Sequence, residues 1–105
     1  MISEAQAWHN FEQSVAKMQS WFTRYEELYN ATVDQHMKTT WQRTGERLTR
    51  AQAEAMVDAM TGPKNFVKVN DAWSQYQRWA RETSTWKDVW QAIREHDRGP
   101  ARTDW

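Results

Sequence analysis

The feature that most constrains the fold of this sequence is a series of apolar side chains that recur at alternating intervals of three and four residues. The series contains Trp8, Phe11, Val15, Met18, Phe22, Tyr25 and Tyr29. On an α-helix such intervals place every member on one face, in the pattern of a coiled-coil seam. Ser3 and Gln6 have the spacing of a capping box. The sequence therefore predicts a helix that begins near residue 4 and packs its seam against a partner helix.

A second and wider apolar stripe, rich in tryptophan, lies nearer the end of the chain. It contains Phe66, Trp73, Tyr76, Trp79, Trp86 and Trp90. The opposite face of the same segment is polar and charged, which is typical of an amphipathic helix. Trp79 and Trp86 are expected in the folded core, and Trp73 at its edge. Such a stripe must be covered by the rest of the chain, by another copy of it, or by a foreign apolar surface.

These two segments predict an all-α protein, either an elongated helical hairpin or a three-helix coiled-coil-like bundle, which self-associates. We expect one helical domain over residues 1–105. Helix one is expected over about residues 4–60. A bend or short break in it is expected near Asn30 or Gly45, where poor helix formers gather. Its last turns carry a ridge of small side chains that would admit a close partner helix: Leu48, Ala51, Ala55 and Ala59.

The clearest turn signal is Thr61-Gly62-Pro63. Glycine suits the left-handed position that closes a helix, and proline suits the first turn of the next one. Helix two is expected over about residues 63–96. A run of hydroxyl side chains at 83–85 is a candidate break within it. Gly99-Pro100 is expected to keep the helix from continuing, so residues 97–105 are expected to form a tail.

The composition explains why the expected core is aromatic. Two Leu, two Ile, six Val and three Phe make only 13 of 105 residues. Eight Trp, three Tyr and five Met compensate, since each aromatic side chain buries a large area. A small chain with so few aliphatic residues forms a marginal core alone. We therefore expect a homo-oligomer.

The charge balance argues against nucleic acid as a partner. There are 14 basic and 14 acidic side chains, so the net charge is zero, whereas nucleic-acid binding depends on a basic excess. A local basic strip contains Lys38, Arg43, Arg47 and Arg50. It could meet an anionic partner, but a solvated helix face with an internal Glu46–Arg50 ion pair is the favoured interpretation.

No catalytic, cofactor-binding or metal-binding residue is predicted, and the chain is not expected to be an enzyme. His9 and Glu12 lie one helical turn apart, but they lack the further ligands that a metal site needs. There is no cysteine. No apolar run is long enough to span a bilayer, and the first residues do not read as a secretory signal. A cytoplasmic protein is therefore expected.

Residues 22–82 resemble the phasins, the small helical proteins that coat bacterial polyhydroxyalkanoate granules. The similar segments are FTRYEELYNATVDQ, RLTRAQAEAMVDAM and PKNFVKVNDAWSQYQRWARE. The segment PKNFVKVNDAW is also similar to the noncatalytic subunit of two-component polyhydroxyalkanoate synthases. The resemblance implies a noncatalytic amphiphile at the granule surface, which self-associates through coiled-coil contacts and has the polymerase as a candidate partner.

The residues of both apolar stripes are thus predicted to serve self-association or the binding of an apolar surface. If the resemblance holds, the partner is the polyester granule. The alternative is a small helical interaction module, an adaptor or inhibitor, whose tryptophan-rich face binds one protein partner. Tryptophan is enriched at protein-binding hot spots and also suits the boundary between water and an apolar phase, so the stripe alone is compatible with both functions.

Overall fold

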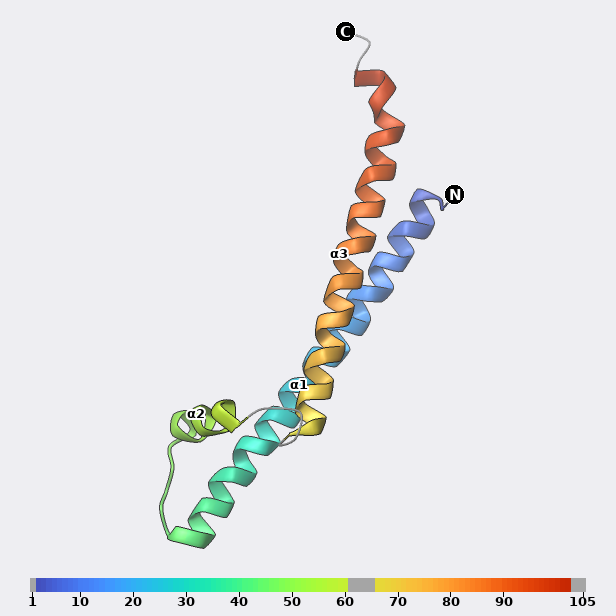
Figure 1. Cartoon of the computed structure of the whole chain (residues 1–105). Helices are drawn as coiled ribbons and strands as arrows, with labels where there is room; N and C mark the ends of the chain where they lie inside the picture. Colours follow the sequence, from blue (N-terminus) through green and yellow to red (C-terminus); the bar gives the residue numbers. More distant parts are fainter. Residues whose placement is uncertain (1, 61–65, 103–105) are drawn as a thin grey trace. The chain divides into compact units, whose positions relative to one another are not determined.

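The computed structural model describes residues 2–60 and 66–102 (Figure 1). Within them the chain forms three α-helices and no strand: α1 (Glu4–Thr44), α2 (Arg50–Met60) and α3 (Val67–Arg102). The all-α class predicted from the apolar spacing is therefore confirmed. The turn predicted at residues 61–63, and Trp105, lie outside the described residues.

The helices contribute to two compact units where the sequence suggested a single domain. The first contains residues 2–20 and 75–102, and the second contains residues 21–60 and 66–74. Both α1 and α3 pass from one unit into the other. Each unit has its own set of contacts and is described by itself below.

The first unit is an antiparallel pair of helical segments. Its outermost described contact is an ion pair of 3.6 Å between Glu4 and Arg94. One turn further along α1, the ring centroid of Trp8 lies 4.8 Å from that of Trp90. Residue numbers rise along α1 and fall along α3 from one contact to the next, so the segments run in opposite directions (Figure 1). This is the helix pairing that the seam predicted.

The first helix was expected over residues 4–60, but this stretch forms two helices in the structure, and α1 ends at Thr44. Gly45 adopts a left-handed φ of 72°, and its N–H donates to the carbonyl of Trp41 at 2.9 Å. A new helix begins after Thr49, whose N–H donates to Gln52 Oε1 at 2.9 Å while its Oγ1 accepts from the Gln52 N–H at 3.1 Å. This reciprocal capping box fixes the start of α2. The break expected near Gly45 is present, and α1 is helical through Asn30.

The predicted second helix corresponds to α3, and it shows no break at residues 83–85. Thr83 Oγ1 donates to the carbonyl of Trp79 at 2.8 Å, and Thr85 Oγ1 donates to that of Arg81 at 3.0 Å. These hydroxyls bond backwards inside one helix and do not cap a new one. α3 also continues to Arg102, beyond the end expected near residue 96. Gly99-Pro100 therefore does not end the helix where the sequence placed its end.

The core of the second unit is small. Val33 of α1 and Ala53 and Val57 of α2 are fully buried and in contact. Around them pack four partly buried side chains: Tyr29, Met37, Leu48 and Phe66. α2 therefore faces α1 through Ala53 and Val57. The ridge predicted along Ala51, Ala55 and Ala59 is exposed. The prediction chose the wrong face because α2 carries alanine on two opposite faces, and small size alone does not show which of them is buried.

Candidate interaction surfaces

Four predicted aromatic side chains meet in the second unit, around Tyr25. The ring centroid of Tyr25 lies 6.3 Å from that of Phe22, 5.9 Å from that of Tyr29 and 5.0 Å from that of Trp73. The first three belong to α1, where intervals of three and four residues place them on one face. Phe22 remains 40% exposed and Trp73 39% exposed. We refer to these four residues as the Tyr25 cluster.

A smaller aromatic group lies in the first unit, around Trp8. Its ring centroid is 5.1 Å from that of Phe11 and 4.8 Å from that of Trp90. The Arg94 guanidinium lies 4.8 Å from the Trp90 ring, in a cation–π arrangement. Trp8 itself is 40% exposed. We refer to Trp8, Phe11 and Trp90 as the Trp8 cluster.

The remaining members of the two predicted stripes are half-buried. They are Val15, Met18, Phe66, Tyr76, Trp79 and Trp86. Lys17 Nζ lies 4.4 Å from the Trp79 ring centroid and the Arg78 guanidinium 5.4 Å from it, so cations cover part of that ring. Trp79 and Trp86 are less exposed than Trp73. Trp79 and Trp86 were expected in the folded core, but neither is among the buried side chains of the structure.

The side chains that are buried are mostly small ones, and none of them belongs to the predicted interaction surface. They are Ala7, Ser14, Val33, Ala53, Val57, Val69 and Ala72. Ser14 Oγ donates to the Asn10 carbonyl at 2.9 Å, which satisfies its polar atom. Small residues permit two helix backbones to approach closely, and large rings then lie beside the line of contact. One signal for the buried residues was present in the sequence. Ala7, which directly precedes Trp8, and Ser14 are small residues seven positions apart, so they lie on the same face of the helix.

The predicted basic strip is divided in the structure. The break after Thr44 separates Arg43 from Arg50, so these residues do not share one helix face. Arg50 lies 2.8 Å from Asp34 and 2.7 Å from Asn30 Oδ1, and its Nε lies 3.1 Å from Glu54. The hydrogen bond to Asp34 raises the pKa of the Arg50 guanidinium. These partners replace the predicted Glu46–Arg50 pair with ion pairs to Asp34 and Glu54, so the guanidinium of Arg50 is neutralised within the chain.

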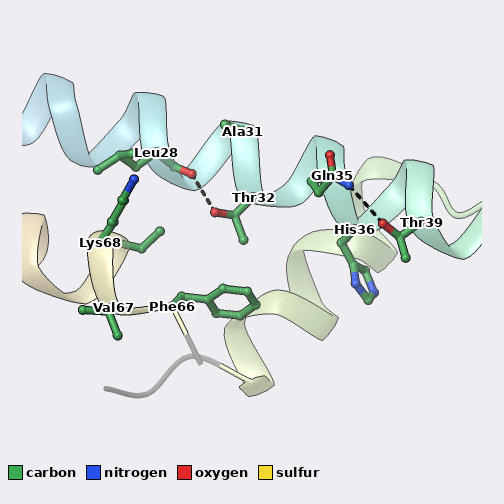
Figure 2. Close-up of a pocket in the computed structure, with 10 residues that line it drawn as sticks. Leu28, Ala31, Thr32, Gln35, His36, Thr39, Phe66, Val67 and Lys68 are labelled. Carbon is green, nitrogen blue, oxygen red and sulfur yellow. Dashed lines mark hydrogen bonds between the residues drawn. The ribbon is translucent and has the colours of Figure 1, made fainter. Parts of the chain in front are cut away.

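A groove that the sequence reading missed lies in the second unit, with a volume of about 630 Å³ (Figure 2). One wall is a face of α1, formed by Leu28, Ala31, Thr32, Gln35, His36 and Thr39. The other wall is Phe66 and the first turn of α3, formed by Val67, Lys68 and Val69. Its lining is mostly apolar, and its size lies within the usual range of small-molecule sites.

Metal ligands do not converge in the part of the chain that the structure describes. Within residues 2–60 and 66–102, no three His, Asp or Glu side chains are placed to hold an ion. His9 and Glu12 are both exposed. Over the same residues, no helix combines the length and apolarity that crossing a membrane requires.

Comparison with known proteins adds no relative. No protein-family model, no curated protein and no solved structure matches this chain.

Proposed function

We propose that this chain is a noncatalytic, phasin-like protein that binds the surface of polyhydroxyalkanoate granules through its aromatic helix faces. One observation carries the proposal. Trp8, Phe22 and Trp73 are each about two-fifths exposed (40%, 40% and 39%), while most of the buried side chains are small. Clustered aromatic surface left in contact with water is typical of an interaction site. Large aromatic side chains of this protein are thus accessible to an apolar partner.

The chemistry of the exposed rings suits an aliphatic polyester. Tryptophan and tyrosine combine an apolar body with one polar tip, and they favour the boundary between water and an apolar phase. A polyester surface presents alkyl groups to the rings and ester carbonyls to the indole N–H and phenol O–H donors. The zero net charge gives no preference for a strongly anionic surface. The resemblance of residues 22–82 to phasins supports the same partner and a cytoplasmic location at the granule.

We also propose that copies of the chain associate when no granule is present. The Tyr25 and Trp8 clusters are the surfaces that contact between copies would cover, since both contain a ring about 40% exposed. Light scattering in the micromolar range is expected to give a mass above 12.6 kDa. A mass of one chain throughout that range would contradict self-association without affecting granule binding.

Granule binding is tested by adsorption of the purified chain to polyhydroxybutyrate particles. Trp73→Ala is expected to weaken adsorption about tenfold, because loss of an anchoring aromatic removes more than about 1 kcal/mol of binding energy. Trp41→Ala is the matched control, since Trp41 is 47% exposed in the same unit but lies outside the Tyr25 cluster. It is expected to adsorb like the wild type.

Two outcomes would count against this function. Failure of the folded wild-type chain to adsorb would exclude a granule coat and favour the protein-binding module. Equal weakening by Trp73→Ala and Trp41→Ala would show that any exposed tryptophan promotes adsorption. It would exclude the Tyr25 cluster as a specific binding surface.

A further inference from the structure

In the second unit, α2 covers part of the apolar face of α1. Val57 of α2 packs against Val33 of α1, and both are fully buried. Tyr29 and Met37, one helical turn before and after Val33, pack against the same core. We refer to Tyr29, Val33 and Met37 as the covered strip. Since Tyr29 also belongs to the Tyr25 cluster, the covered strip continues a surface that is proposed to bind the granule.

α2 is itself amphipathic, and α1 covers only part of its apolar face. Its apolar residues are spaced by three, one and three positions, so they share one face of the helix. They are Ala53, Met56, Val57 and Met60. Ala53 and Val57 are fully buried, whereas Met56 is 43% exposed and Met60 is 37% exposed. The apolar face of α2 is therefore wider than its contact with α1, and methionine adapts well to irregular apolar surfaces.

The attachment of α2 to α1 is weak. The buried core between them consists of small side chains, and an isolated helix of 11 residues is marginal in water. The hydrogen bond between Tyr29 and Asp58 is exposed. The ion pair of Arg50 and Asp34 joins side chains that are 44% and 66% exposed, and exposed ion pairs contribute little stability. Gly45 begins a segment without helix between α1 and α2, so α2 can separate while α1 stays helical.

We propose that α2 is a latch, which detaches from α1 at the granule surface and exposes the covered strip and its own apolar face to the polyester. This inference rests on the proposed function and describes how the same partner reaches a larger apolar surface. A partner shifts an equilibrium between two forms only by its difference in affinity for them. The apolar area that the open form can bury on the polyester supplies that difference. In water alone the same area favours the closed form.

Opening of the latch is tested first without a partner, by the reaction of a buried thiol with a thiol reagent. The chain has no cysteine, so one substitution places a single thiol at a chosen site. Val33→Cys places it under α2. Ala72→Cys is the matched control, because Ala72 is 1% exposed in the same unit but lies outside the core that α2 shares with α1. The Val33→Cys thiol is expected to react about tenfold faster, since local opening requires less free energy than unfolding of the unit.

A disulfide tests whether release of α2 contributes to adsorption. Val33 and Ala53 belong to one buried core, so Val33→Cys/Ala53→Cys joins α2 to α1 when it is oxidised, which mass spectrometry verifies. The oxidised form is expected to adsorb to polyhydroxybutyrate particles about tenfold more weakly than the same protein after reduction. The reduced form is the matched control, because the two forms differ by the disulfide alone. Val33→Cys/Val57→Cys takes the place of this pair if the first pair does not oxidise.

Two results would overturn the latch. One is an equal reaction rate of the Val33→Cys and Ala72→Cys thiols, which would mean that α2 leaves α1 only when the unit unfolds. The other is equal adsorption of the oxidised and reduced double variant, which would mean that α2 stays closed on the polyester. Failure of the folded wild type to adsorb has a different meaning. It would refute the granule function, and the two thiol reaction rates would then decide whether α2 opens.

Discussion

Tyr29 of α1 donates a hydrogen bond of 2.7 Å to the carboxylate of Asp58 in α2. At the other end of α2, Arg50 bonds to Asp34 and Asn30 of α1. α2 has 11 residues, and an isolated helix of that length is marginal in water. Its helical state therefore depends on these two polar links and on the buried contact of Val57.

The Tyr29–Asp58 bond predicts a pH dependence at alkaline pH. Burial, then the hydrogen bond and charge of Asp58, raise the pKa of Tyr29 to about 12, whereas an unfolded tyrosine titrates near 10. The folded chain therefore holds this proton more tightly. The resulting stability is complete below about pH 10 and is lost as the pH rises toward 12. We expect the free energy of unfolding to fall more steeply over that range in the wild type than in Tyr29→Phe.

Urea unfolding followed by circular dichroism at several pH values measures this difference. If the Tyr29→Phe and wild-type curves run parallel between about pH 10 and 12, the raised pKa contributes nothing to stability.

The buried contact predicts a contrast between two valines. Val33→Ala removes two methyl groups from a fully buried site and is expected to lower the free energy of unfolding by about 1–3 kcal/mol. The same change at Val67, which is 63% exposed, is expected to stay within about 0.5 kcal/mol. Alanine is the better helix former, which reduces the loss at Val33 slightly. Equal melting temperatures of the two variants would refute the assignment of Val33 to the core.

The sequence predicted the helices well because their signals are local. The intervals from Trp8 to Tyr29 require a helix, and Gly45 was one of two candidate break points. The Thr49–Gln52 capping box was also present in the sequence and would have selected Gly45 over Asn30. The threonines at 83 and 85 misled the prediction because their hydroxyls bond back to the helix as readily as they cap one.

The buried residues could not be predicted in the same way. Large aromatic rings dominate any apolar count, yet the close approach of two helices selects small residues such as Ala7 and Ser14. The face of α2 that meets α1 was also ambiguous, because alanine occurs on two opposite faces of that helix. The groove depends on Phe66 approaching α1, and a contact between residues so far apart in the sequence leaves no periodic signal.

Arg50 provides a test of the polar link at the start of α2. Its guanidinium reaches Asp34 and Asn30 through different nitrogens, a geometry that the single ammonium of lysine does not reproduce. Arg50→Lys is therefore expected to speed amide hydrogen exchange in α2 several-fold, with little effect on α1. Arg43→Lys, which retains the charge at an exposed site of α1, is the control. Unchanged exchange in α2 would mean that charge alone suffices there.

The last prediction concerns the residue that ends α1. Gly45 has a φ of 72°, and no atom lies within 4 Å of the position a Cβ would take. The effect of a substitution is therefore a backbone effect alone. A left-handed conformation costs an ordinary residue about 1–2 kcal/mol, and asparagine tolerates it better. Gly45→Ala is expected to destabilise the chain by about 1 kcal/mol and Gly45→Asn by less, as measured by urea unfolding. If Gly45→Ala is more stable than the wild type and gains helix content by circular dichroism, α1 and α2 join into one helix, and the glycine alone had kept them apart.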